Sequence, residues 1–95
     1  MFDWDPRKAK NNRRKHGVSF EEAATAFLDP VGLDGADVEH SESEERRLRL
    51  AKSSLGRILV SAYTMRRRDD EKVTRIISAR RASRKERKKY EVEED

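Results

Sequence analysis

Apolar and polar positions follow a helical period in the first third of the chain. The pair Asp5-Pro6 has the form of an N-cap followed by proline at the first helical position. It predicts a helix that runs through Lys15 and stops at Gly17. The short aromatic segment Phe2–Trp4 in front of this helix is typical of an edge strand.

A second helix is predicted to open at the capping box Ser19–Glu22 and to end at Asp29-Pro30. Its apolar residues recur at i, i+3, i+4, i+7 and i+8, which places them in one stripe on the helix surface. They are Phe20, Ala23, Ala24, Phe27 and Leu28. We expect this stripe to be buried.

The helical period disappears after the second helix. Val31–Leu33 has the composition of a short strand, and the Gly-, Asp- and Glu-rich segment from there to Glu45 predicts a loop. Arginine and leucine then alternate over residues 47–50, which predicts a strand with a period of two. The turn Ser53–Gly56 follows it.

The last part of the chain predicts two more strands and a helix. Arg57–Met65 is nearly all apolar, as in the middle of a sheet, and Val73–Ala79 returns as the next strand after a polar hairpin loop over Arg66–Lys72. A second capping box, Ser83–Glu86, opens a terminal helix with almost no apolar stripe. Such a helix would cover a basic surface or dock on a partner.

These elements predict an α+β fold in which residues 1–95 form a single domain. We expect an antiparallel sheet of three to five strands, with the two N-terminal helices on one face and a helix at the C-terminus. The opposite face would be open to solvent and lined by arginine, a geometry that can hold single-stranded RNA.

The composition narrows the possible functions. Cysteine is absent, which excludes a disulfide framework, a zinc knuckle and cysteine catalysis. The chain has no apolar run of about 20 residues and no apolar segment after Met1, so we expect a cytoplasmic protein without membrane attachment. Charged residues make up 44% of the chain.

The charges are segregated along the sequence. Residues 21–45 hold nine Asp and Glu and no Lys or Arg, whereas residues 46–90 hold 17 Lys and Arg against four Asp and Glu. A basic block of this kind is the electrostatic footprint of a nucleic-acid-binding protein. We expect the acidic stretch to repel phosphate elsewhere on the surface.

A set of residues spread over the whole chain carries a family resemblance. They are Phe2, Trp4, Asp5 and Lys8; Asn12, Lys15–Val18 and Phe20–Ala23; His40, Ser41 and Glu44–Arg46; Gly56–Val60; Tyr63, Thr64 and Arg66; Ile76–Ala82; Glu86 and Tyr90. In order and spacing these residues resemble the BrnT-type toxins.

The resemblance implies a RelE-like fold and a metal-independent ribonuclease without a cofactor. It also implies a toxin that inhibits translation and growth until a BrnA-type antitoxin neutralises it. RNA would be the substrate, and operator DNA would be bound only through the toxin–antitoxin complex.

RNA cleavage without a metal needs cations on the reacting phosphate, and arginine suits this task because its planar fork binds phosphate in two places. Arg80 and Arg81, after the last strand, are the first candidates, provided that this strand ends at Ala79. Arg66 at the end of the central strand is the next. The alternative for the pair is a surface ion pair with Glu86.

The acid and the base are less clear from the sequence. His40 in the acidic loop is the first candidate and Lys8 could add a cation, although an ordinary loop histidine and a solvated lysine are the alternatives. Glu44 and Glu45 are weaker candidates for the base. His16 is better explained as a packing or capping residue at a helix end.

Other residues are expected to bind RNA rather than to react with it. They are Arg67, Arg75 and Arg84, and Tyr63 as a base-stacking residue on the open face. For Tyr63, packing at the rim of the sheet is the alternative. A different class of function stays open, namely a basic nucleic-acid-binding or co-repressor module without catalysis. A third interpretation makes the chain an interaction partner, contacted by the antitoxin at the polar last helix and at Phe2–Trp4.

Overall fold

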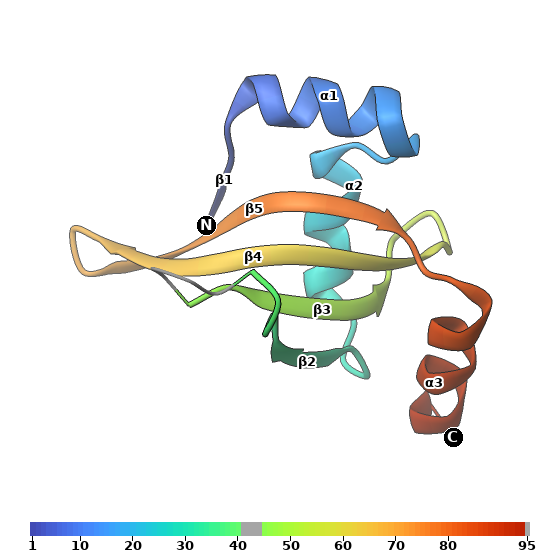
Figure 1. The fold of residues 1–95 in the computed structure, drawn as a ribbon. Helices are drawn as coiled ribbons and strands as arrows, with labels where there is room; N and C mark the ends of the chain where they lie inside the picture. The colour runs from blue at the N-terminus through green and yellow to red at the C-terminus, as the bar shows by residue number, and fades with distance from the viewer. Residues whose placement is uncertain (41–44, 95) are drawn as a thin grey trace.

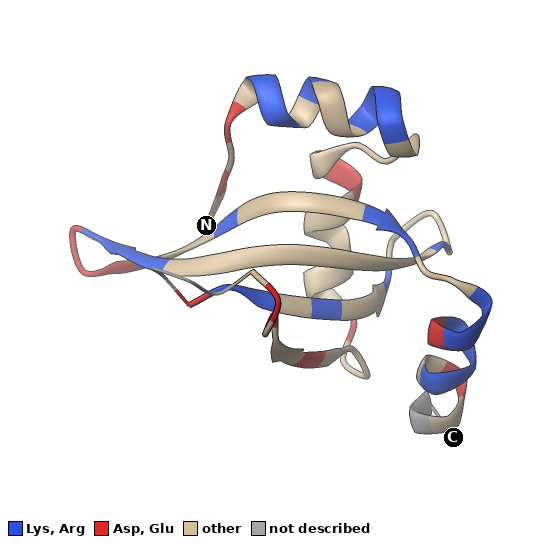
Figure 2. Ribbon diagram, in the orientation of Figure 1, with Lys and Arg blue, Asp and Glu red and all other residues tan. Residues whose placement is uncertain are grey.

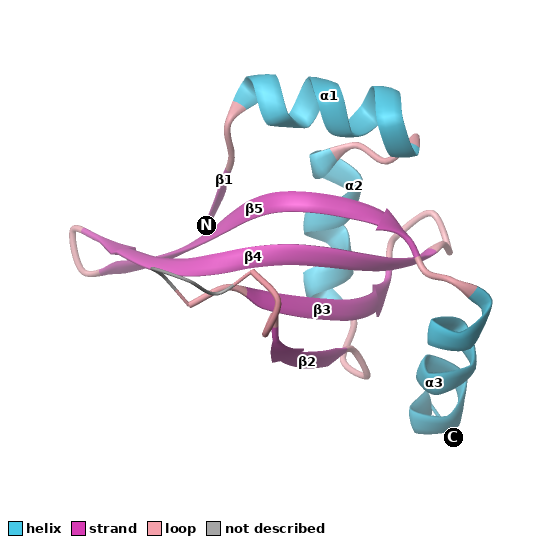
Figure 3. Ribbon diagram, viewed as in Figure 1, coloured by secondary structure: helices cyan, strands magenta, loops and turns pink. Residues whose placement is uncertain are grey.

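The computed structural model describes residues 1–40 and 45–94 and contains a five-stranded sheet with three α-helices (Figures 1 and 3). The sheet order is β1-β5-β4-β3-β2. In chain order the elements are β1 (Phe2–Asp3), α1 (Pro6–His16), α2 (Phe20–Thr25), the 3-10 turn η1 (Ala26–Leu28), β2 (Leu33–Ala36), β3 (Arg47–Lys52), β4 (Ile58–Arg68), β5 (Glu71–Arg81) and α3 (Arg84–Glu94). None of the helices is long and apolar enough to cross a membrane.

The sheet is mixed rather than antiparallel. Strands β2 to β5 form antiparallel pairs, but β1 lies parallel to β5, with Phe2 opposite Thr74 and Asp3 opposite Arg75. The α+β class and the edge position of the first strand are therefore confirmed, whereas the fully antiparallel sheet was wrong. The direction of a two-residue strand depends on distant pairing, which its own sequence does not specify.

Strands β4 and β5 extend beyond the predicted limits at the hairpin. The predicted loop Arg66–Lys72 is a tight turn at Asp69 and Asp70, with φ of 50° and 67°, between paired strands. Positive φ at both central residues is the pattern of a type I′ turn, which matches the twist of a hairpin. The strand ends project past the sheet (Figure 1), where charged residues face solvent and give no apolar signal.

Strand β5 is also longer at its other end. It continues through Arg81, with Arg80 paired to Val60 and Arg81 to Leu59. The expectation that the strand ends at Ala79 was wrong. Because adjacent residues of a strand point to opposite faces, Arg80 and Arg81 are separated by the sheet itself.

The core lies between the sheet and α2, which covers one face (Figure 1). Its fully buried members include Val18, Phe20, Leu59 and Ile76, and the Trp4 ring meets Phe20 edge-on at 5.9 Å. The predicted apolar stripe is confirmed as far as Phe27, which packs against this cluster. The α-helix ends earlier, at Thr25, and η1 leaves Leu28 80% exposed.

Helix α1 runs along the β5 side of the sheet instead of covering a face beside α2 (Figure 1). Its predicted caps are present: the Asp5 side chain accepts a hydrogen bond from Arg7 N at 2.8 Å, and Gly17 ends the helix with φ of 69°. Ser19 caps α2 as expected, with Glu22 N donating to Ser19 Oγ at 3.0 Å. The other half of the predicted capping box is not formed, because the Glu22 carboxylate accepts from Ser53 and Arg57 instead of from Ser19 N.

The buried side chain of Asn12 fastens α1 to β5. Its Oδ1 accepts from Ala79 N at 3.1 Å, and its Nδ2 donates to Ala79 O at 2.7 Å and to Val18 O at 2.9 Å. The amide thus pairs with the free edge of β5 in the way a neighbouring strand would. All three partners are backbone groups, and buried backbone groups need hydrogen-bond partners.

Replacing Asn12 with alanine is expected to lower the free energy of unfolding by about 2–4 kcal/mol, because buried backbone groups of β5 lose their partners. The adjacent Asn11 is exposed, so Asn11→Ala is the matched control and should change stability by less than about 0.5 kcal/mol. Urea denaturation of both variants measures this. Equal effects would contradict the assignment.

The hairpin turn gives a second stability prediction. Asp70→Gly is expected to stabilise the protein by about 0.5–1 kcal/mol, because glycine adopts the observed positive φ without a steric penalty. Asp70→Ala removes the same charge but keeps the Cβ, and should not stabilise. Thermal unfolding of the two variants separates the backbone effect from the charge effect, and a stabilising alanine would argue against it.

Candidate functional site

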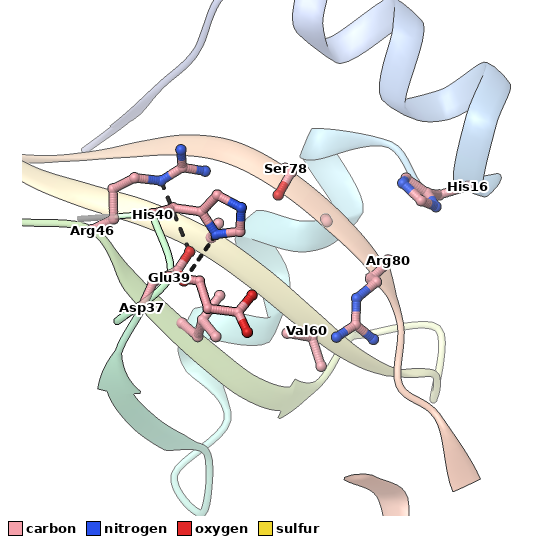
Figure 4. Close-up of a pocket in the computed structure, with 11 residues that line it drawn as sticks. His16, Asp37, Glu39, His40, Arg46, Val60, Ser78 and Arg80 are labelled. Atoms are coloured by element: carbon pink, nitrogen blue, oxygen red, sulfur yellow. Dashed lines mark hydrogen bonds and ion pairs between the residues drawn. The ribbon is translucent and has the colours of Figure 1, made fainter. Parts of the chain in front are cut away.

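A cavity of about 280 Å³ lies on the sheet face turned away from α2 (Figure 4). Its floor comes from β3, β4 and β5, and charged or polar side chains from other elements surround it. The lining residues are His16, Asp37, Glu39, His40, Arg46, Leu48, Val60, Ala62, Ser78, Ala79 and Arg80. We call this space the open-face cavity.

Arg80 stands at one end of the open-face cavity (Figure 4). Its Nη1 and Nη2 atoms donate to the two carboxylate oxygens of Glu86 at 2.8 and 2.9 Å, and Nη1 also lies 3.3 Å from Arg81 O. The alternative weighed from the sequence, an ion pair with Glu86, is therefore present. Glu86 occupies the edge of the guanidinium that is formed by Nη1 and Nη2. The side-on edge, formed by Nε–H and the second Nη2–H, can still donate two hydrogen bonds to another anion.

Glu86 both orients Arg80 and caps the N-terminus of α3. Ser83 N donates to Glu86 Oε1 at 2.8 Å, and Glu86 N donates to Ser83 Oγ at 3.2 Å, which confirms the predicted capping box. The hydrogen bonds from Arg80, with a further contribution from Ser83, lower the pKa of Glu86 to about 2. The carboxylate is thus held charged against the arginine.

His40 stands at the other end of the open-face cavity, with Asp37 beneath it (Figure 4). The His40 Nδ1 atom lies 3.1 Å from Asp37 Oδ1, and Arg46 Nε lies 4.0 Å from Asp37 Oδ2. The Asp37 side chain is 8% exposed, whereas that of His40 is 59% exposed. A largely buried carboxylate therefore orients an accessible imidazole, the usual arrangement for an acid–base histidine.

His16 lines the same cavity on the Arg80 side (Figure 4). It lies one helical turn after Asn12, so both side chains project from one face of α1. The clamp between Asn12 and β5 thereby brings His16 towards Arg80. A packing or capping role was preferred for His16 from the sequence, because the contact of α1 with β5 that brings it to the cavity is long-range. Arg46 was not proposed as a site residue from the sequence, although it also lines the cavity.

Three of the candidate catalytic residues lie elsewhere. Arg81 points to the opposite face from Arg80, so the two do not form one phosphate site on the open face. Arg66 is paired with Val73, seven residues from Arg80 along β5, or roughly 20 Å. Lys8 is exposed on α1 and does not line the open-face cavity.

Tyr63 was expected to stack on RNA from the open face, and its position contradicts this. The residue is 6% exposed and lies on the α2 side, where its ring meets Phe27 edge-on at 5.0 Å. Its hydroxyl donates to Asp34 Oδ1 at 2.6 Å. Burial and this hydrogen bond raise the pKa of Tyr63 and make it a structural residue.

The other residues expected to bind RNA lie on the surface, outside the open-face cavity. Arg67 and Arg84 are exposed, and Arg75 forms an ion pair with Asp3 at 3.2 Å. Lys and Arg in Figure 2 are spread over α1, β3, the hairpin and α3 rather than gathered on one face. Among the described residues, the arginines that line the open-face cavity are Arg46 and Arg80.

Some residues of the acidic stretch 21–45 lie beside arginines of the basic block 46–90. Asp37 and Glu39 line the open-face cavity together with the two arginines. Glu45 is exposed, and its Oε1 lies 3.9 Å from Arg47 Nη1. Ser41 and Glu44, also considered from the sequence, lie outside the described residues. Within residues 1–40 and 45–94, no group of three His, Asp or Glu side chains could hold a metal ion.

Comparison with known proteins identifies the relatives of this chain. The family model described as the ribonuclease toxin BrnT of type II toxin–antitoxin systems matches residues 4–86. The structure is similar to the crystal structure of the Brucella abortus ribonuclease toxin BrnT, with a TM-score of 0.64 and 20% sequence identity over 88% of this chain and 99% of that chain. No curated protein matches.

The pair Arg80–Glu86 predicts how stability depends on pH. The pKa of Glu86 falls from 4.5 to about 2 on folding. Its contribution to the free energy of unfolding is therefore complete above pH 4.5 and is lost as the pH falls towards about 2. Glu86→Gln should therefore be less stable than the parent at pH 7, and the difference should shrink between pH 4.5 and pH 2. Urea denaturation across this range measures it.

The control places Glu86→Gln in an Arg80→Gln background, where the pH-dependent difference should be smaller. A difference that is independent of pH in both backgrounds would contradict the ion pair as its origin.

Proposed function

The chain belongs to the BrnT family of ribonuclease toxins of type II toxin–antitoxin systems, and from this premise we propose that it is an endoribonuclease that cleaves RNA in the open-face cavity without a metal ion. The observation that carries the proposal is the convergence there of two histidines with two arginines, which come from three separate segments of the chain. This combination supplies both acid–base groups and phosphate-binding cations.

Cleavage without a metal uses the ribose 2′-OH as the nucleophile. A base removes its proton as the oxygen attacks the adjacent phosphorus, and the bond from phosphorus to the 5′-oxygen breaks while an acid protonates that oxygen. The products are a 2′,3′-cyclic phosphate and a free 5′-OH. We assign His40 as the base, because Asp37 accepts from Nδ1–H and leaves Nε2 to take the proton.

His16 is assigned as the acid, because it lines the cavity on the Arg80 side, on the opposite side of the cavity floor from His40 (Figure 4). Arg80 would bind the phosphate through its side-on edge, while Glu86 keeps the guanidinium in place. Arg46 would add a second positive charge from the His40 side. Charge on the phosphorane oxygens is then balanced from both ends of the cavity.

A toxin of this class is paired with an antitoxin. We propose that a BrnA-type antitoxin neutralises the chain, that unrestrained cleavage of RNA inhibits translation, and that operator DNA is bound through the complex. Occupation of the open-face cavity would be an efficient mode of inhibition, because the arginines that bind RNA phosphate would be covered. Antitoxin and RNA would then compete.

The proposal predicts which single substitutions abolish cleavage. Arg80→Gln should lower kcat by about 10²–10³-fold, because the transition state loses a cation that the cavity holds in place. Lys8→Gln, which removes one positive charge away from the cavity, is the control and should stay within a few-fold of the parent. The assay follows a labelled RNA with EDTA present, using folded, antitoxin-free protein.

A parent protein that binds RNA and never cleaves it would favour the alternative, a non-catalytic binding or co-repressor module. Equal losses in Arg80→Gln and Lys8→Gln would move the site away from the open-face cavity.

The roles of the two histidines predict the pH profile of kcat/KM. The parent should give a bell-shaped profile, with an acid limb from the base and an alkaline limb from the acid. His40→Gln should remove the acid limb and His16→Gln the alkaline limb, each with a large loss of rate. Limbs that persist in both variants would refute the assignment.

A further inference from the structure

A second cavity lies on the other side of the end of β5. It measures about 380 Å³ and is formed where the turn before β4, the last residues of β5 and the first turns of α3 come together. Its charged lining residues are Arg57, Arg81, Arg87 and Glu91. We call it the arginine cavity, and neither the family description nor the mechanism above assigns it a role.

The arginine cavity contains one guanidinium group that is already satisfied. Arg57 forms an ion pair with the buried carboxylate of Glu22, and its Nη2 donates to Gly17 O at 3.0 Å. The hydrogen bond from Arg57 is the main cause of the lowered pKa of Glu22. Arg57 is therefore committed to the fold, which fixes one wall of the cavity.

The other two arginines are not committed in this way. Within the described residues, the side chains of Arg81 and Arg87 form no hydrogen bond and no ion pair within 4 Å, and both residues are exposed. The charge of Arg81 acts on Glu22 only from a longer distance, where it helps to lower the pKa of that carboxyl group. They come from β5 and α3, so the fold brings two guanidinium groups that make no hydrogen bond among the described residues to one concave surface. Two positive charges repel each other, and an anion bound between them offsets this repulsion.

The chemistry of arginine restricts what this anion is. Its planar fork matches the oxygens of a phosphate or carboxylate group, and two forks from different directions match a tetrahedral phosphate. Glu91 on the cavity wall adds a negative charge, which weakens the binding of a free anion. We therefore expect the cavity to bind a phosphate group mainly when that group belongs to a longer ligand that also contacts the protein elsewhere.

The arginine cavity lies next to the open-face cavity in the sequence of β5. Arg80 and Arg81 are consecutive residues on opposite faces of the strand, and Arg80 lines the open-face cavity whereas Arg81 lines the arginine cavity. On the basis of the proposed ribonuclease function, we propose that Arg81 and Arg87 bind a backbone phosphate of the RNA chain next to the scissile phosphate. The substrate would thus wrap around the end of β5.

The test compares a long and a short substrate. A decanucleotide RNA can reach both cavities, whereas a dinucleoside monophosphate carries only the scissile phosphate. In Arg81→Gln/Arg87→Gln, the ratio of kcat/KM for the decanucleotide to that for the dinucleoside monophosphate should fall about tenfold through a higher KM for the decanucleotide. The slope of log Kd against log salt should decrease by about 1.

The matched control is Arg13→Gln/Arg14→Gln, which removes two exposed arginines from α1, outside both cavities. It should keep the substrate ratio of the parent. A ratio that falls equally in both double variants, or in neither, would overturn the proposal. If the double variant fails to fold, Arg87→Gln, an exposed helix position, provides the same comparison.

The two proposals fail in different ways. A parent that cleaves neither substrate would contradict the ribonuclease function, and the Kd of the decanucleotide would then decide the subsite alone. A Kd for the decanucleotide that is about tenfold higher in Arg81→Gln/Arg87→Gln than in the control supports the phosphate subsite. Equal Kd values in the two variants would overturn it.

Discussion

A single buried amide connects the fold to its candidate site. The side chain of Asn12 occupies the edge of β5 in place of another strand and bonds to both backbone groups of Ala79 and to Val18 O. Val18 belongs to the core, Ala79 directly precedes Arg80, and His16 follows Asn12 by one helical turn. Helix α1, the core and the open-face cavity therefore depend on the same three hydrogen bonds.

The second constraint is the balance of charge around the sheet. A chain with so many arginines could bind polyanions without discrimination, but most of the arginines near the sheet have carboxylate partners. Glu22 binds Arg57, Asp34 binds Arg49 at 2.6 Å, and Glu86 binds Arg80. These pairs fix the orientation of each guanidinium, and they leave defined edges for phosphate rather than a diffuse positive surface.

Local signals in the sequence predicted the fold well where the physics is local. The N-caps at Asp5 and Ser19 and the capping box at Ser83 are formed as expected, because each depends on residues within one turn. Strand length was less predictable. The charged ends of β4 and β5 are stabilised by pairing with each other, which hydropathy does not record.

The candidate site was predicted only in part, for a related reason. Arg80 and His40 do line the open-face cavity, and His40 has the neighbouring carboxylate that its acidic loop indicated. A packing or capping role was preferred for His16, because α1 reaches the site through Asn12, which bonds to a residue 67 positions away. Arg46 was not proposed, because its place beside Asp37 depends on the pairing of β2 with β3. The separation of Arg80 from Arg81 follows from two extra strand residues, a difference within the usual uncertainty of a strand end.

The most direct test of this account is a map of where a nucleic acid that cannot be cleaved binds. An oligodeoxynucleotide lacks the 2′-OH nucleophile and can be titrated into isotope-labelled protein while backbone amide shifts are recorded. The account predicts the largest shifts at the cavity residues from β4, β5 and the segment after β2, together with His16. Shifts confined to the projecting hairpin and the outer face of α1, with the open-face cavity unchanged, would contradict it.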